Sequence, residues 1–149
     1  MLKRRRKRFC FSTQQFGSRL VFSHVVSGNE VNMDHNAAYP ELDQFIGGNF
    51  HQDWTVDAEE RGDALHTDSV VLQVFAHVNA AYLMALKEDI NGLLACNYNE
   101  EELRGVIHDE FDGNVEPSIE GSSMQEWLEH VRHMIDEALI RLGSNRPPK

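Results

Sequence analysis

The residues best suited to chemistry lie in one short block, Gly47-Gly48-Asn49-Phe50-His51-Gln52-Asp53-Trp54, here called the GG block. His51 and Asp53 supply an imidazole and a carboxylate, the pair that a hydrolase uses for general acid–base catalysis. Side chains two residues apart do not face one another on a helix, however, and so short a pattern is common. We therefore keep a small metal-dependent hydrolase using His51 and Asp53 as the alternative, and favour a polar pair that ties a turn to a helix.

The other members of the GG block have structural uses. Gly47 and Gly48 let the backbone turn or approach another surface closely, and we expect them to end the first helix. Phe50 and Trp54 are large side chains that favour burial. The polar side chains between them, including Gln52, then need water, a partner or each other for hydrogen bonding.

A second group of possible ligands lies near the end of the chain. His130 and His133 are three residues apart on an expected helix, with several carboxylates close by, and such spacing can bind a transition metal. The same pattern is typical of a solvated helix face, which we favour. The sequence also lacks a P-loop, a GxGxxG motif and a GxSxG motif. We therefore predict no catalytic residues, no metal and no cofactor, and favour a binding role.

Charge divides the chain into two unlike parts. Residues 1–32 contain seven Lys and Arg side chains and one acid, whereas residues 33–149 contain seven bases and 23 acids, a net charge of −16. So acidic a part repels nucleic acid and anionic membranes, and attracts cations or a basic protein. The alternative is that the acidity only provides solubility. No apolar run approaches the roughly 18 residues of a membrane span, and two cysteines give no disulfide framework, as in a reducing compartment.

The domain boundaries follow from this division. We expect residues 1–33 to form a basic, unstructured or loosely ordered extension outside the functional domain, residues 34–143 to form one helical domain, and residues 144–149 to form a flexible tail. A hydrophobic content of 41% is enough for a single core. The alternative for the head is a real basic tail in which residues 3–8 bind nucleic acid.

Helical periodicity runs through the expected domain. Apolar residues recur every three or four positions, predicting helices over residues 40–46, 55–62, 68–77, 80–95, 100–111 and 124–142. Asp68, Asn79 and Asn99 are the expected N-caps, and four valines within 70–78 leave a strand as the alternative there. Ser123 and Glu126 form a capping box before the last helix, whose apolar face includes Trp127. The predicted fold is an all-α bundle of four to six helices.

Three stretches of this sequence resemble a known family. They are Tyr39-Pro40-Glu41-Leu42-Asp43-Gln44-Phe45, the GG block, and Ser122-Ser123-Met124-Gln125-Glu126-Trp127-Leu128-Glu129-His130-Val131-Arg132. Together they resemble the helical immunity proteins of bacterial contact-dependent growth inhibition systems, whose second block is close to Gly-Gly-Tyr-Phe-His-Gln-Asp-Trp. The chain departs from this pattern at Asn49, where an aromatic residue is usual. The resemblance extends over residues 39–135 and leaves out the basic head.

The resemblance implies a cytoplasmic binding protein without enzymatic activity. Such a protein binds the C-terminal domain of its cognate toxin, as a monomer and one-to-one, and protects the cell from delivered or self-made toxin. The toxin domain is often a nuclease, and a nuclease surface is basic because it holds phosphates. An acidic immunity protein would match that surface and speed association. Neither nucleic acid nor a membrane is an expected partner.

Two sets of residues become candidates under this reading. The family signature, expected to be structural, comprises Gly47, Gly48, Phe50, His51, Gln52, Asp53, Trp54 and Trp127. The candidate toxin-binding residues are the acids Asp53, Asp57, Glu59, Glu60, Asp63, Glu100, Glu101 and Glu102. For both acidic runs the alternative remains a solvated face or the favourable first turn of a helix.

Overall fold

The computed structural model describes residues 33–62 and 66–144, in which helices are joined by short loops and turns. The prediction of an all-α fold is confirmed, since no strand occurs in these two ranges. The elements are α1 (His35–Ala38), α2 (Pro40–Asn49), α3 (Trp54–Arg61), α4 (Thr67–Phe75), α5 (Ala80–Ala95), α6 (Glu100–Gly105), a π-helical turn (Val106–Glu110), a 3-10 turn (Pro117–Glu120) and α7 (Met124–Ser144). The basic head, Asp63 and the C-terminal tail lie outside the described residues.

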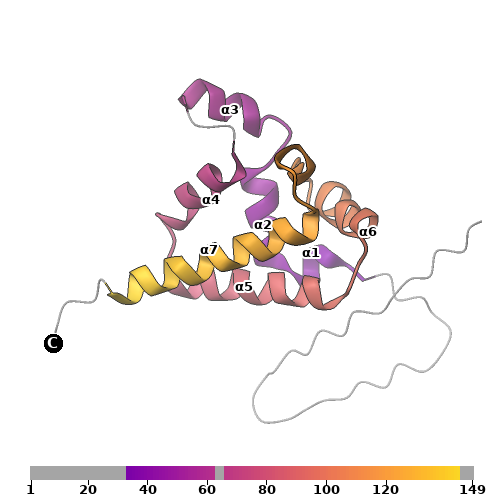
Figure 1. The fold of residues 1–149 in the computed structure, drawn as a ribbon. Helices are drawn as coiled ribbons and strands as arrows, with labels where there is room; N and C mark the ends of the chain where they lie inside the picture. The colour runs from indigo at the N-terminus through magenta and orange to yellow at the C-terminus, as the bar shows by residue number, and fades with distance from the viewer. Residues whose placement is uncertain (1–32, 63–65, 145–149) are drawn as a thin grey trace, which may run out of the picture.

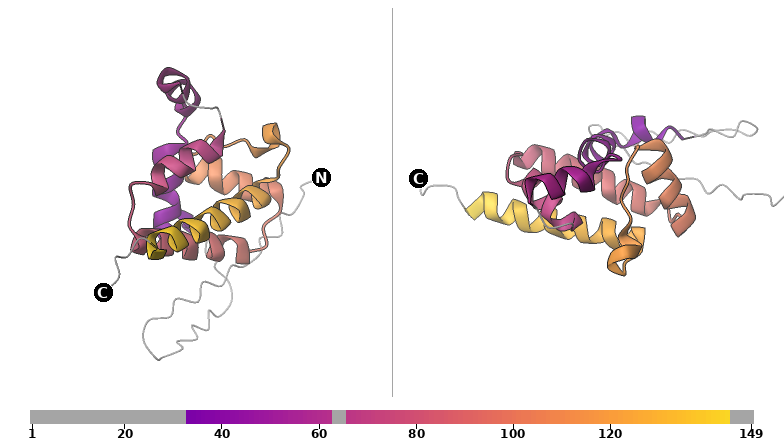
Figure 2. Two further views of the ribbon diagram at one scale, coloured as in Figure 1. Left: turned by 60° about the vertical axis from the view of Figure 1, so that its left-hand side comes forward. Right: turned by 90° about the horizontal axis from the view of Figure 1, so that it is seen from above.

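The two longest helices, α5 and α7, form the base of the bundle (Figure 1). They run antiparallel, because Lys87 pairs with Asp136 at 2.6 Å while Asn91 accepts a hydrogen bond from Arg132 at 3.1 Å. The helices α2, α4 and α6 pack onto this pair (Figure 2). The side chains they enclose include Leu42, Phe45, Leu86, Ile90, Leu128 and Ile135. None of the described helices is long and apolar enough to cross a membrane.

The expectation that Gly47 and Gly48 end the first helix is wrong. The helix α2 runs through both glycines to Asn49 and is followed by Phe50. Gly47 has a different use, since a Cβ atom there would lie 2.9 Å from the carbonyl oxygen of Phe111. The glycine thus permits close packing of two backbones rather than a change of direction.

The helix predicted over residues 68–77 exists, but its boundaries differ. It begins at Thr67, so Asp68 lies in the first turn and is not the N-cap, and it ends at Phe75. The strand alternative is wrong, and the buried Val70, Val71 and Phe75 show the helical period. The backbone amide of Thr67, in the first turn, donates to the carboxylate of Glu120, which lies outside the helix. Sequence periodicity cannot reveal such a contact.

The segment predicted as one helix over residues 100–111 changes type half-way. After α6 the backbone widens into the π-helical turn, and Leu103, Val106, Ile107 and Phe111 are all buried. Residues 117–120, which lie outside the predicted helices, form the 3-10 turn. Asn79 and Asn99 are confirmed as N-caps of α5 and α6. The last helix extends past Gly143 to Ser144, slightly further than predicted.

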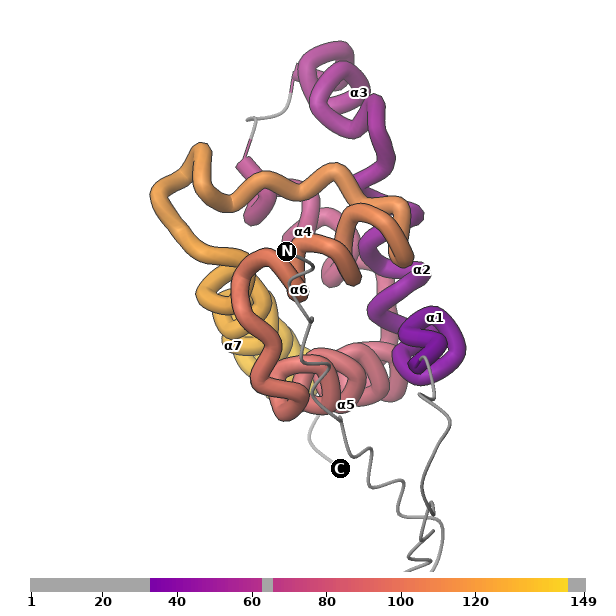
Figure 3. Tube along the Cα trace, turned by 90° about the vertical axis from the view of Figure 1, so that its right-hand side faces the viewer, coloured from indigo at the N-terminus to yellow at the C-terminus, as the bar shows by residue number. Residues whose placement is uncertain are grey.

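The helix α3 stands away from the rest of the bundle. It projects beyond the ends of α2 and α4 in Figures 1 and 3. Only Trp54 and Ala58 of this helix are buried. Gly62 ends it with a positive φ of 73°, a conformation that glycine adopts without strain. The helix therefore exposes nearly all of its surface while two residues attach it to the core.

Candidate functional site

The aromatic residues of the GG block enter the core. The ring of Phe50 contacts those of Phe45, Trp54 and Trp127, with centroids 5.8, 5.5 and 5.6 Å away, each in edge-to-face geometry. Such aromatic pairs contribute about 0.5–1.5 kcal/mol beyond the area they bury. The predicted burial of both Phe50 and Trp54 is confirmed, and Trp127 joins them from α7.

Asn114 holds the backbone around these rings in place. Its amide N–H donates to the carbonyl of Phe50 at 2.5 Å, and its side chain donates to the carbonyl of Gln52 at 3.4 Å. In return, its own carbonyl accepts from the indole N–H of Trp54 at 2.8 Å. Asn114 and the GG block are about 60 positions apart, so no local sequence signal indicates that they meet.

His51 does not pair with Asp53. Its Nε2 lies 3.3 Å from the carboxylate of Asp57, one turn further along α3, and its Nδ1 accepts from the amide N–H of Asp53 at 3.3 Å. The carboxylate of Asp53 is exposed and makes no cap hydrogen bond to α3. Both imidazole nitrogens are therefore engaged locally, which is poor geometry for the hydrolase alternative.

The two histidines of α7 point to different carboxylates. His130 Nε2 lies 3.0 Å from Asp68 on α4, and His133 Nε2 lies 3.6 Å from Glu137 on its own helix. Within residues 33–62 and 66–144, no three His, Cys, Asp or Glu side chains are placed to hold one metal ion.

The acids of α3 are open to solvent. Glu59 and Glu60 are exposed, and neither side chain makes a hydrogen bond or ion pair with another described residue. Asp57 turns inward towards His51 and lines a hollow of about 200 Å³ between α3, α4 and the end of α2. The structure thus places Asp53, Asp57, Glu59 and Glu60 together on the projecting helix and its approach.

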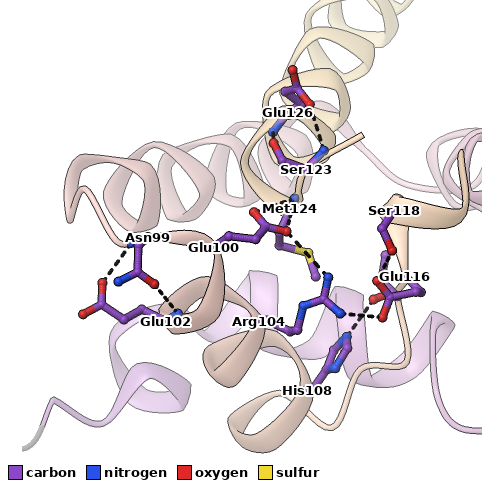
Figure 4. Close-up of polar contacts among 11 residues, drawn as sticks. Asn99, Glu100, Glu102, Arg104, His108, Glu116, Ser118, Ser123, Met124 and Glu126 are labelled. Carbon is purple, nitrogen blue, oxygen red and sulfur yellow. Dashed lines mark hydrogen bonds and ion pairs between the residues drawn. The ribbon is translucent and has the colours of Figure 1, made fainter. Parts of the chain in front are cut away.

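The acids of α6 are largely tied to the backbone (Figure 4). Both carboxylate oxygens of Glu100 accept from the first amide of α7, that of Met124, at 2.8 and 3.0 Å. Glu102 and Asn99 form a reciprocal capping box at the start of α6, with distances of 2.8 and 2.9 Å. Only Glu101 is exposed without a partner in the described part of the chain.

Two further carboxylates in Figure 4 fix the loop before α7. Glu116 accepts from the Ser118 hydroxyl at 2.6 Å and from Arg104 at 2.8 Å, and these hydrogen bonds, the serine first, lower the pKa of its carboxyl. Glu126 and Ser123 form the predicted capping box, with distances of 2.8 and 3.1 Å. The Ser123 amide lowers the pKa of the Glu126 carboxyl.

Comparison with known proteins identifies the family. The model of the family described as CdiI immunity protein matches residues 38–135, about two thirds of the chain. This chain belongs to the CdiI immunity protein family. A chain in the crystal structure of a CdiA-CT/CdiI complex from Y. kristensenii is similar, with a TM-score of 0.59 and 27% identity over 70% of this chain and 99% of that one. No match was found among curated proteins.

This CdiI family member also uses acids to cap helices from other elements. Asp89 of α5 accepts from the amides of Glu41 and Leu42 at the start of α2, at 2.8 and 3.1 Å. Burial raises the pKa of the Asp89 carboxyl, and the two amide hydrogen bonds oppose that shift. Glu120 accepts from the Thr67 amide at the start of α4, at 3.3 Å. These caps link residues about 50 positions apart, so no local sequence signal indicates them.

Thr67 and His35 are two buried polar residues that sequence reasoning missed. The hydroxyl of Thr67 accepts from the indole N–H of Trp127 at 3.1 Å. The ring of His35 lies 2.7 Å from Glu110 and 2.9 Å from the hydroxyl of Tyr98, so it joins α1 to the π-helical turn and to the loop before α6. Both residues have all their polar atoms engaged, as burial requires.

Proposed function

We propose that this CdiI family member binds the C-terminal domain of a cognate toxin in the cytoplasm and neutralises it one-to-one, without catalysis. The observation that carries the proposal is family membership over residues 38–135. The likeness to a chain from a CdiA-CT/CdiI complex supports a toxin domain as the partner. An inhibitor of this kind needs a complementary surface rather than a reactive group, and the local pairing of His51 is consistent with that.

The partner's chemistry follows from charge. Residues 33–149 carry a net charge of −16, which favours a basic toxin domain, and a nuclease that holds phosphates is the expected class. An acidic protein opposite such a domain speeds association and excludes the anionic substrate. Both effects weaken as salt rises, because exposed charges are screened beyond a Debye length of about 8 Å at 0.15 M.

The candidate acids differ in their availability to this partner. Glu100 and Glu102 already accept backbone hydrogen bonds, whereas Glu59 and Glu60 on α3 are exposed and unpaired within the described residues. The projection of α3 also makes it accessible to a partner from several sides. We therefore favour the α3 acids over those of α6 as the toxin-binding residues.

Co-expression with the toxin domain encoded by the neighbouring gene tests the proposal. The toxin domain alone should stop growth, and this protein should restore it. The purified pair should elute as a one-to-one complex in light scattering. A toxin that still kills at full strength beside well-expressed, folded protein would remove the proposal.

A further inference from the structure

A small polar hollow lies between the GG block and the turn that follows the π-helical turn. It measures about 190 Å³, and its walls are Gln52, His108, Asp112, Gly113 and Asn114. The GG block therefore contributes to two hollows on either side of its polar loop, through His51 to the one beside α3 and through Gln52 to this one. Among the described residues, no Lys or Arg side chain lines the second hollow.

Side chains around this hollow offer acceptor atoms, and the amides of Gln52 and Asn114 carry N–H donors as well. His108 Nε2 lies 2.7 Å from the carbonyl of Val115, and a carbonyl only accepts, so the ring proton of the neutral imidazole is on Nε2. Its Nδ1 is left with a lone pair. The Asp112 carboxylate and the Gln52 side-chain amide make no hydrogen bond or ion pair within the described part of the chain. Asp112 and Gln52 thus offer a carboxylate and an amide oxygen to a ligand in the hollow, and these acceptors suit a cation that donates several hydrogen bonds.

The backbone beneath these groups is fixed before any ligand arrives. The amide of Gly113 donates to Ile107 at 2.9 Å and that of Asn114 donates to Phe50 at 2.5 Å. A Cβ atom at Gly113 would overlap the side chain of Ile46, so the turn is packed directly on α2. Asp112 adopts a positive φ of 52°, which is uncommon for a residue other than glycine. Such pre-organisation lowers the entropy cost of binding.

We propose that this hollow binds one Lys or Arg side chain of the toxin domain. The inference rests on the proposed function and adds a defined subsite to it, away from the α3 acids. A guanidinium or ammonium group fits the acceptor set by charge and by hydrogen bonding, and buried Arg contacts are common among the residues that dominate interface energies.

Asp112→Asn and Asp109→Asn make a matched pair of tests. Each variant removes one exposed carboxylate, and the two positions are three residues apart, but only residue 112 lines the hollow. Asn is also among the residues that tolerate a positive φ, so Asp112→Asn should keep the turn. The probe is the toxin domain encoded by the neighbouring gene, and its Kd is measured by titration calorimetry at about 0.15 M salt. We expect Asp112→Asn to raise the Kd tenfold or more and Asp109→Asn to raise it less than threefold.

The outcomes separate the two proposals. If the unmodified protein binds the toxin domain and both variants weaken binding equally, the hollow is no subsite, and the proposed function stands. If the unmodified protein does not bind, the proposed function and this inference are both lost. A toxin Lys or Arg whose substitution by Ala weakens binding to the unmodified protein but not to Asp112→Asn would identify the occupant. Gln52→Ala should weaken binding as well, and an unchanged Kd for both Gln52→Ala and Asp112→Asn would overturn the inference.

Discussion

Two acidic helices of this protein look alike in sequence and differ in structure. On α6, Glu100 accepts both its hydrogen bonds from the start of α7, and Glu102 caps its own helix. On α3, Glu59 and Glu60 are exposed, with no partner among the described residues. Two carboxylates of α6 thus stabilise helix ends, whereas two carboxylates of α3 remain available to a partner.

The difference shows how a net charge should be read. Asp89 and Glu120 cap α2 and α4 from other elements, as Glu100 caps α7. A carboxylate at a helix N-terminus satisfies amides that otherwise lack partners and interacts favourably with the helix dipole. Part of the acidity is therefore required by the fold, and only the remainder can have been selected for a partner or for solubility.

The largest effect is expected where α3 is attached. Trp54→Ala should lower the free energy of unfolding by about 3–5 kcal/mol, because a buried aromatic side chain and its hydrogen bond to Asn114 are lost. Chemical denaturation followed by circular dichroism measures this. Trp54→Phe keeps a ring and should cost less, about 1–3 kcal/mol for the unpaired Asn114 carbonyl.

The same variant can break the comparison between the two helices. If Trp54→Ala leaves stability intact and abolishes toxin binding, Trp54 is itself part of the interface. The structural interpretation of the GG block would then be wrong, and the α3 acids would be only its surroundings.

The capping side of the comparison is tested on α6. Glu100→Ala should lower the free energy of unfolding by about 1–2 kcal/mol, as for other lost N-terminal caps, because the Met124 amide loses its acceptor. Glu101→Ala removes the same charge from the neighbouring exposed position and should change stability by less than about 0.5 kcal/mol. Equal losses for both variants would mean that the Glu100 hydrogen bonds contribute nothing measurable.

Sequence reasoning predicted the elements better than it predicted their contacts. Apolar periodicity correctly indicated α4, α5 and α7, and the local capping residues Asn79, Asn99 and Ser123 were identified because their partners lie three residues away. The caps from Asp89 and Glu120 could not be predicted, since their partners come from distant elements. The GG block was recognised as unusual, but the role of Gly47 became evident only from its contact with the Phe111 backbone.

The sequence indicates which acids are candidates for the site, but not how they are arranged in space. The sequence does not distinguish Glu100 from the acids of the run 57–60, because the amide that Glu100 accepts from belongs to Met124, 24 positions away. The hollow beside Gln52 needs Asp112 and Asn114, 60 or more positions away, and only the fold brings them together. Specificity in a binding protein depends on such assembled surfaces, which no motif records.

The binding side of the comparison is tested with paired charge removals. Glu59→Gln with Glu60→Gln should slow association with the toxin domain about tenfold while changing stability by less than about 0.5 kcal/mol. Glu88→Gln with Glu101→Gln removes the same charge from exposed positions on α5 and α6 and serves as the control. Stopped-flow association rates at several salt concentrations measure the effect. A larger effect from the control pair would move the interface away from α3.

The smallest effect concerns pH. The pKa of Glu116 is lowered in the folded protein, chiefly by the Ser118 hydroxyl and then by Arg104. A lowered folded pKa means that this carboxylate contributes stability above its unfolded pKa of about 4.3, and that the contribution is lost as pH falls through the folded value. The difference in Tm between the unmodified protein and Glu116→Gln should therefore be constant near neutral pH and shrink below about pH 4. Glu101→Gln, which removes an exposed carboxylate without a hydrogen-bond partner in the described chain, gives the control. A Tm difference between the unmodified protein and Glu116→Gln that widens in acid would mean that the Glu116 carboxylate does not stabilise the loop before α7. In that case α6 would resemble α3 more closely than its contacts indicate.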